Sequence, residues 1–242
     1  MKIVVIDPVM IPEQCKQKLA TMGYLEIYDS MPESPDVLIE RIKDADIILV
    51  GKTAIRREAL SHAVKLKMIC VCHTGYDNVD VEAATDRGII VSNVPNYATE
   101  AVAEFVFAVA LDLLRKIEVA DVMAHKGEFD NHYYLHNRLL AGKTIGVIGA
   151  GDIGRRVIQI ARSFNMNVIA TTAHPSPERE AELGASFVPL DDLLKKSDVV
   201  TLHLPLSSQT EHLIGLRELK LLKPTAILIN TSRGKVIDEN AL

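Results

Sequence analysis

The stretch "VIGAGDIGRRV" (147–157) places Gly149, Gly151 and Gly154 in a G-x-G-x-x-G spacing. An apolar segment precedes it, and an amphipathic helical pattern at 152–164 follows. In a strand–turn–helix of this kind the first glycine permits a tight turn. The second lets the backbone approach a pyrophosphate, and the third lets the helix pack close to the strand. Amides at the start of the helix would face the phosphates. The pattern predicts that these glycines bind a dinucleotide. The alternative is that they serve the turn and its packing alone.

The next strand pattern, 167–172, runs into "ATTAHP" (170–175), where the ribose of a dinucleotide would lie. Thr172 stands where a carboxylate would bind both ribose hydroxyls and repel a 2′-phosphate. Thr171, Thr172 and His174 are candidates to accept such a phosphate, although no arginine supports them. The cofactor is therefore expected to be NAD or NADP, with only a slight preference for NADP. The alternative for His174 is a solvated loop histidine.

Composition limits the classes of protein to which the chain can belong. It has 242 residues, 48% of them apolar, and a net charge of −5 with lysines and arginines dispersed. Dispersed, outnumbered basic residues argue against a nucleic-acid partner. No apolar run approaches the ~18 residues of a membrane span, and the start "MKIVVIDPVM" indicates a first strand rather than a signal peptide. A soluble cytoplasmic protein is expected.

Short apolar segments alternate with helical patterns in both halves, which predicts an α/β fold with two doubly wound parallel-sheet (Rossmann-like) domains. The Ala-, Val- and Leu-rich stretch 98–127 is expected to form one long helix or a broken pair joining them. We predict domains at 1–98 and 99–242. The expected strands are 2–7, 25–28, 46–51, 68–73 and 89–94 in the first domain, and 144–150, 167–172, 186–190, 198–204 and 225–231 in the second.

Four motifs together resemble one family. They are "HTGYDNVDVEAATDRGIIVSNVPNYATEAVAEFVFAVAL", "GKTIGVIGAGDIGRRV", "DVVTLHLPLSSQTEHLI" and "LLKPTAILINTSRGKVIDENAL". In this order they resemble the D-isomer-specific 2-hydroxyacid dehydrogenases, which include glycerate, phosphoglycerate and D-lactate dehydrogenases. The resemblance implies hydride transfer between NAD(P)H and a small 2-oxo or 2-hydroxy acid. It also implies a flavodoxin-like substrate-binding domain at 1–98 and an NAD(P)-binding domain at 99–242. It does not identify the acid.

The resemblance also implies roles for individual residues. Arg233 matches the catalytic arginine that binds the substrate carboxylate and carbonyl, and a guanidinium suits that role because it makes two fixed hydrogen bonds. Thr74 and Gly75 match the loop that meets the substrate carboxylate, and Thr74 also approaches the cofactor. The other positions that match cofactor contacts are Asp152, Ile153, Leu204, Pro205, Thr210, Thr231, Ser232 and Arg233 itself.

The family's catalytic glutamate and histidine match positions beyond Leu242. We therefore expect the C-terminal part of the second domain to be incomplete in this sequence, and residues 1–242 alone to be inactive or nearly so. Losing a general acid costs typically ~10²–10⁴ in rate. His203 is the best substitute histidine within the chain, but a packing role is favoured for it. A non-catalytic dinucleotide-binding sensor or corepressor-like protein is the alternative function.

Two further expectations concern metals and assembly. Cys70, Cys72 and His73 cannot all face one ion because side chains alternate along a strand, so no metal site is predicted. The helix 98–127 and the arm "FDNHYYLHNR" (129–138) resemble the region through which similar proteins dimerise, and a homodimer is expected. Tyr133 and Tyr134 would anchor that contact or cover the seam between the domains.

Overall fold

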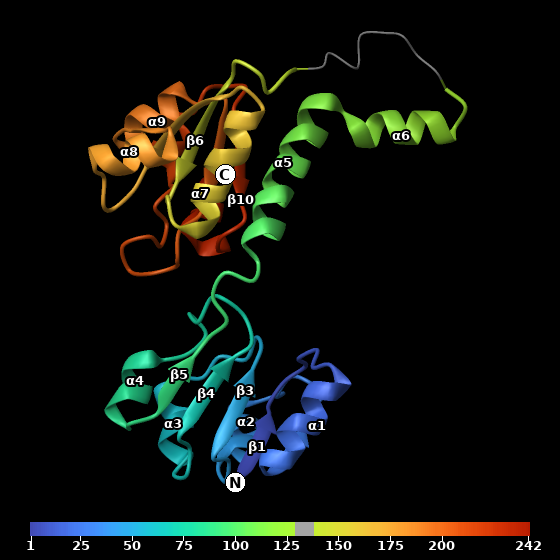
Figure 1. Ribbon diagram of the computed structural model, residues 1–242, viewed down its shortest axis with the longest axis vertical. Helices are drawn as coiled ribbons and strands as arrows, with labels where there is room; N and C mark the ends of the chain where they lie inside the picture. Colours follow the sequence, from blue (N-terminus) through green and yellow to red (C-terminus); the bar gives the residue numbers. More distant parts are fainter. Residues whose placement is uncertain (129–137) are drawn as a thin grey trace. The chain divides into compact units, whose positions relative to one another are not determined.

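The computed structural model describes residues 1–128 and 138–242, which form two compact units, Met1–Tyr97 and Ala98–Leu242. Each unit contains a five-stranded sheet in which every pair of neighbouring strands is parallel. The expectation of two parallel α/β sheets is therefore confirmed (Figure 1). Tyr133 and Tyr134 lie outside the described residues.

The first unit has the strand order β2-β1-β3-β4-β5, the 2-1-3-4-5 order of flavodoxin-like sheets. Its buried strand residues, such as Val4, Ile48 and Ile69, pack against helices through one continuous apolar core. The elements are β1 (Lys2–Val5), α1 (Glu13–Met22), β2 (Tyr24–Ile27), α2 (Pro35–Ile42), β3 (Ile47–Val50), α3 (Arg57–His62), β4 (Met68–Val71), α4 (Val81–Asp86) and β5 (Ile90–Ser92).

The second unit has the strand order β10-β9-β6-β7-β8. With β6 numbered as the first strand and the sheet read from β8 to β10, this order is 3-2-1-4-5, as in Rossmann folds. The elements are α5 (Thr99–Arg115), α6 (Ile117–His125), β6 (Thr144–Ile148), α7 (Asp152–Ser163), β7 (Asn167–Thr171), α8 (Pro177–Leu183), β8 (Ser186–Phe187), α9 (Leu190–Lys196), β9 (Val199–Leu202), α10 (Leu216–Leu219) and β10 (Ile227–Asn230), followed by the 3₁₀ turns η2 (Gly234–Val236) and η3 (Glu239–Ala241).

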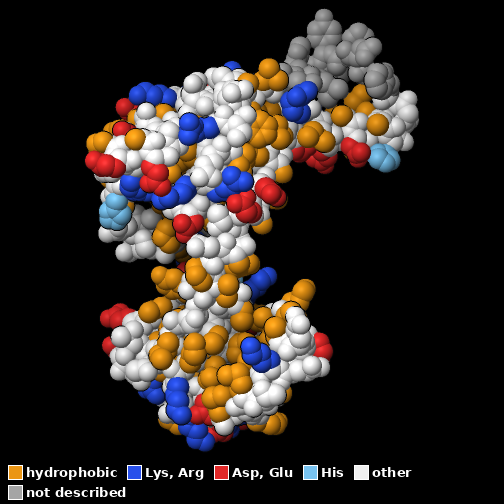
Figure 2. Space-filling model, in the orientation of Figure 1, with side chains coloured by type: hydrophobic (Ala, Val, Ile, Leu, Met, Phe, Trp, Pro, Cys, Tyr) orange, Lys and Arg blue, Asp and Glu red, His pale blue; other side chains and the backbone are white. Residues whose placement is uncertain are grey.

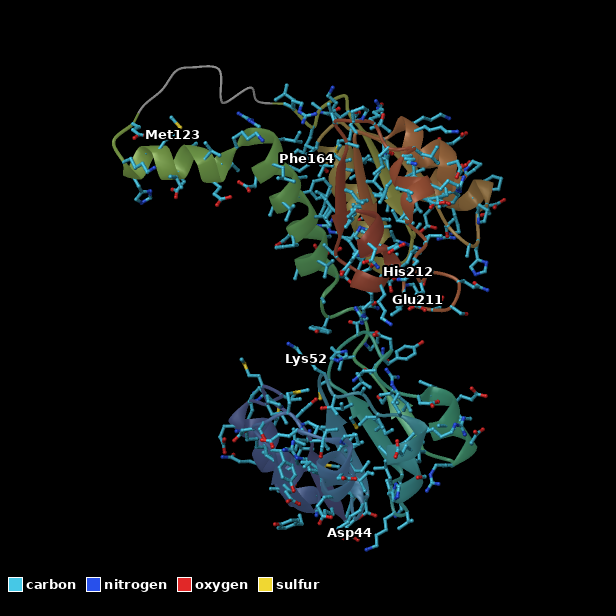
Figure 3. All side chains as sticks on the ribbon, turned by 180° about the vertical axis from the view of Figure 1, so that it is seen from behind. Asp44, Lys52, Met123, Phe164, Glu211 and His212 are labelled. Atoms are coloured by element: carbon cyan, nitrogen blue, oxygen red, sulfur yellow. The ribbon has the colours of Figure 1, made fainter. Side chains whose placement is uncertain are left out.

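Both faces of this second sheet are covered, which explains why its strands are mostly apolar. Val199 belongs to the core shared with α5 and α7, whereas its neighbour Val200 belongs to the core shared with α9. On the α5 and α7 side, the rings of Phe107 and Phe164 stack with their centroids 5.3 Å apart, and Phe164 is labelled beside α5 in Figure 3.

The structure decides the question of the 98–127 helix in favour of a broken pair. Lys116 lies between α5 and α6 with φ 55°, a left-handed conformation that ends the first helix. The strand expected at 186–190 is shorter than predicted, covering only Ser186–Phe187. Pro189 cuts it short because it has no N–H for the sheet and stands at the N-cap of α9.

Candidate functional site

The glycine loop of the second unit connects β6 to α7 at the carboxyl edge of the sheet. Gly149 has φ +97°, and a Cβ on it would overlap the His203 backbone at the end of β9. A Cβ on Gly154 would overlap the carbonyl oxygen of Gly149, so this glycine lets α7 begin directly against the loop. A Cβ on Gly151 would meet nothing within 4 Å. Gly151 is therefore not required by packing, and the space beside it is open.

This loop lies where the sheet changes direction. The chain leaves β6 toward β7 and β8 and then returns to the other side of β6 as β9. In open α/β sheets, ligands bind beyond the carboxyl ends of the strands at such a switch point. Asp152 and Ile153 form the first turn of the twelve-residue helix α7, whose free N–H groups and dipole favour an anion. Open space, an exposed Gly151 and a helix N-terminus fit a dinucleotide pyrophosphate.

The other predicted cofactor residues of the second unit follow the ends of the neighbouring strands. Thr172 follows β7, and its hydroxyl accepts a hydrogen bond from the His174 amide at 3.5 Å, while the His174 side chain is exposed. Leu204 and Pro205 follow β9. Thr210 holds that loop closed, since its hydroxyl donates to the Pro205 carbonyl at 2.6 Å and accepts from the Ser207 amide at 2.8 Å.

Arg233 lies just beyond β10, at the same edge of this sheet. Asn230 fixes the turn that leads to it, because its amide donates to the Arg233 carbonyl at 2.8 Å and its side-chain oxygen accepts from the Ser232 amide at 3.0 Å. The Arg233 side chain bonds back to the Ser232 carbonyl at 2.9 Å. Thr231, Ser232 and Arg233 thus form a hydrogen-bonded turn two strands from the glycine loop.

Between these two features lies His203, and its surroundings support the packing role. Its ring nitrogens lie 3.0 Å from the Thr201 hydroxyl and 3.5 Å from the Thr231 hydroxyl. Burial lowers the pKa of His203 from 6.5 to about 4. The imidazole is therefore neutral near pH 7 and is held between two strands.

In the first unit, Thr74 and Gly75 follow β4 in a loop tied to its neighbours. The Thr74 hydroxyl donates to the Val94 carbonyl at 3.0 Å, and Asn93 donates to the Thr74 carbonyl at 2.7 Å. The His73 ring also contacts the Gly51 carbonyl, next to the loop that follows β3. The backbone around Thr74 and Gly75 is thus fixed by bonds to two other strand ends.

Sequence reasoning missed Asp7, which holds the loop after β3 at the carboxyl edge of the first unit's sheet. Its fully buried carboxylate accepts three backbone N–H bonds, from Gly51 at 2.7 Å, Lys52 at 2.8 Å and Thr53 at 2.7 Å. Lys52 is labelled in Figure 3. A polar residue directly after the buried strand "KIVVI" was the available signal, since parallel strands end at a common edge.

Sequence reasoning also missed Arg179, and the expectation that no arginine supports Thr172 is wrong. Arg179 lies in the first turn of α8, and its Nη1 is 3.4 Å from the Thr172 hydroxyl. Arg179 lies beyond the "ATTAHP" stretch that follows the strand. Ser176 and Pro177, a typical helix start, could have indicated that residue 179 lies at the same edge of the sheet.

Cys70 lies in β4 and Cys72 directly follows it, and both side chains are partly buried. Burial raises the pKa of both thiols, and that of Cys72 reaches about 11. They therefore stay protonated near neutral pH and are poor metal ligands and nucleophiles. No group of three His, Cys, Asp or Glu side chains that could hold a metal ion occurs among residues 1–128 and 138–242.

The comparisons with known proteins match the second unit to a family of cofactor-binding domains. Residues 107–242 match the family described as "D-isomer specific 2-hydroxyacid dehydrogenase, NAD binding domain". A glyoxylate reductase of Thermococcus litoralis is 41% identical over 241 residues, which cover 96% of this chain and 72% of the relative.

Two solved structures extend the likeness to the whole fold. "Acyclic imino acid reductase (Bsp5) in complex with NADPH and D-Arg" is 37% identical with a TM-score of 0.90, covering 100% of this chain and 77% of that one. The D-lactate dehydrogenase of Aquifex aeolicus, complexed with NAD and lactic acid, is 32% identical with a TM-score of 0.89, covering 98% and 71%.

The fold and the glycine loop define an α/β oxidoreductase that uses NAD or NADP. The chain belongs to the D-isomer-specific 2-hydroxyacid dehydrogenases, which transfer a hydride between NAD(P)H and a small 2-oxo or 2-hydroxy acid. The predicted family is thereby confirmed, and it takes precedence over the non-catalytic sensor. In the described part of the chain, no helix is long and apolar enough to cross a membrane.

Proposed function

We propose that the chain binds the dinucleotide on the glycine loop of the second unit and a small 2-oxo acid through Arg233. The observation that carries the proposal is that Arg233 and the glycine loop lie at the same carboxyl edge of one parallel sheet, two strands apart. A guanidinium there can make two parallel hydrogen bonds to a carboxylate. Bound NAD(P)H supplies the hydride.

Each remaining site residue has a proposed part in this arrangement. Gly149, Gly151, Asp152, Ile153 and Gly154 hold the pyrophosphate. Leu204, Pro205 and Thr210 border the cofactor, and Thr231 and Ser232 present Arg233 beside the nicotinamide. Thr172 and His174 lie at the ribose, and the tied loop at Thr74 and Gly75 offers backbone amides to the substrate carboxylate.

We propose glyoxylate, hydroxypyruvate and pyruvate as the acids to test first, because the Thermococcus litoralis relative is described as a glyoxylate reductase. Each acid is supplied with NADH and with NADPH, and the loss of nicotinamide absorbance is followed.

Arg233→Gln and Arg233→Lys test the substrate anchor. The glutamine variant is expected to lower kcat/KM by roughly 10²-fold or more, because it loses both charge and fork geometry. Lysine keeps the charge, so its loss is expected to be smaller. An unchanged urea unfolding transition in both variants separates a loss of substrate binding from a loss of folding. Cofactor binding without reduction of any 2-oxo acid would instead favour a sensor.

We further propose that the protein is a cytoplasmic homodimer. Support for the dimer comes from α6, none of whose residues is buried although Ile117, Val119 and Val122 are apolar. Phe105 and Leu113 of α5 are exposed as well. Figure 2 shows hydrophobic side chains at the surface of these helices. Contiguous exposed apolar side chains on a soluble protein typically mark an interface.

A further inference from the structure

The guanidinium of Arg179 connects three segments at the end of β7. Its Nη2 donates to the carbonyl oxygen of Ala150, in the glycine loop, at 2.9 Å. Its Nη1 contacts the Thr172 hydroxyl at 3.4 Å and donates to the His174 carbonyl. The Phe187 ring centroid lies 5.5 Å from its Cζ. The cation is therefore held in place beside the glycine loop rather than extending into solvent.

The charge of Arg179 is not compensated by these partners. Two are backbone carbonyls and one is a hydroxyl, and no carboxylate in the described residues forms an ion pair with it. Its neighbours on α7 differ, since Arg155 pairs with Glu182 at 2.6 Å and Arg156 pairs with Glu100 at 2.8 Å. A guanidinium has five N–H donors. Within the described residues, Arg179 donates only from Nη1 and Nη2. Its Nε–H therefore remains to bind an anion.

The nearby carboxylates on α8 are directed to other partners. Glu182 binds Arg155, and Glu180 accepts a hydrogen bond from the Phe187 amide. At the strand end itself, a threonine hydroxyl stands where NAD-binding sites place an acid. The ribose position therefore offers one fixed cation and one hydroxyl and lacks the acid that would repel a phosphate. This is the chemistry that recognises a phosphate monoester.

We propose that Arg179 binds the 2′-phosphate of NADPH, and that the chain consequently prefers NADPH to NADH. The inference rests on the proposed function, which seats the dinucleotide on the glycine loop. Arg179 belongs to α8 and not to the end of β7, where the residue that distinguishes the two cofactors usually lies. Its side chain reaches the ribose position from this helix. Its bond to Ala150 sets the guanidinium at a fixed place relative to the pyrophosphate loop.

The experiment measures dissociation constants for NADPH and NADH by nicotinamide fluorescence titration of the purified chain. Arg179→Gln is expected to weaken NADPH binding roughly 10- to 100-fold, the equivalent of one or two charged hydrogen bonds. NADH binding is expected to change by less than about threefold, because its ribose carries no phosphate. In competition titrations, 2′,5′-ADP should lose affinity for the variant, whereas 5′-ADP should not.

A second variant keeps the arginine and its bond to Ala150. Thr172→Asp places a carboxylate beside the guanidinium, where it pairs with Arg179 and repels the phosphate, so NADPH is expected to lose affinity while NADH keeps or gains it. Lys195→Gln is the charge-matched control. Lys195 is exposed near the end of α9, at the opposite edge of the sheet, so both constants should stay within about twofold.

The outcomes separate the inference from the proposed function. Equal weakening of NADPH and NADH by Arg179→Gln would mean that Arg179 only ties the loop together, and would overturn the inference. Unchanged NADPH binding in this variant, or stronger NADPH binding in Thr172→Asp, would overturn it as well. Each of these results leaves the dinucleotide site intact. Failure of the unaltered chain to bind either dinucleotide would overturn the proposed function itself.

Discussion

Asp7 is a single residue on which the edge of the first unit's sheet depends. Its carboxylate is buried, and its two oxygens accept the N–H groups of Gly51, Lys52 and Thr53. Backbone donors in the interior must be paired, because an unsatisfied one costs about as much as a lost hydrogen bond. The loop after β3 is therefore held by one side chain that follows the neighbouring strand β1.

Asp7→Asn is expected to destabilise the first unit by about 1–3 kcal/mol. The amide NH₂ would replace a carboxylate oxygen, and the backbone N–H that this oxygen accepts would lose its acceptor. Urea unfolding measures the change. Asp44→Asn is the matched control. Asp44, labelled in Figure 3, forms an exposed pair with Lys65 at 3.2 Å, so its loss should change stability much less than the loss of the buried Asp7 carboxylate. Equal effects of the two changes would contradict this account.

His203 gives the second unit a pH-dependent stability. Burial lowers its pKa from 6.5 to about 4, so the unfolded chain binds the proton more readily than the folded one. The contribution is complete above pH 6.5 and is lost as the pH falls toward 4. It should amount to about 2 kcal/mol between pH 7.5 and pH 5.

The measurement is urea unfolding at both pH values for the unaltered chain and for His203→Gln, which cannot titrate. The variant is expected to lose less stability on acidification by about that amount. An identical acid dependence of the two chains would show that other groups cause it.

At the scale of elements, the junction of β6 and α7 shows which glycines serve the fold and which leave space for a ligand. Gly154 faces the carbonyl oxygen of Gly149, whereas Gly151 faces open space. Both fit the spacing quoted from the sequence, yet only one of them is demanded by packing. The spacing predicted the strand–turn–helix, and the structure separated the two roles.

Gly154→Ala is expected to destabilise the second unit by about 1–3 kcal/mol, because the new methyl group must displace α7 from the loop. Gly151→Ala should change stability by less than about 0.5 kcal/mol while weakening NADH or NADPH binding by about tenfold or more, since its methyl group occupies the open space. Thermal unfolding and cofactor titration of the two variants test this pair. Normal cofactor binding by Gly151→Ala would show that the pyrophosphate lies elsewhere.

At the scale of the whole molecule, the exposed apolar face of α5 and α6 is expected to mediate a homodimer. Val119 and Val122 are 44% and 46% exposed. Sedimentation velocity should give a dimer for the unaltered chain and a monomer for the double variant Val119→Asp and Val122→Asp, because two charges would be buried in an apolar contact. Val64→Asp, at a 75% exposed position of the first unit, should leave the dimer intact. A monomeric unaltered chain at micromolar concentration would refute the dimer.

The sequence by itself determined the α/β class, the strand–glycine loop–helix and the family, because these depend on local periodicity, turn sterics and motif order. It did not determine which side chains meet across the sheet edges. Asp7 holds residues 44 to 46 positions away. Arg179 meets Ala150 only because α8 and the glycine loop flank the end of β7. Such contacts follow from strand order and helix packing, so only the tertiary structure could decide them.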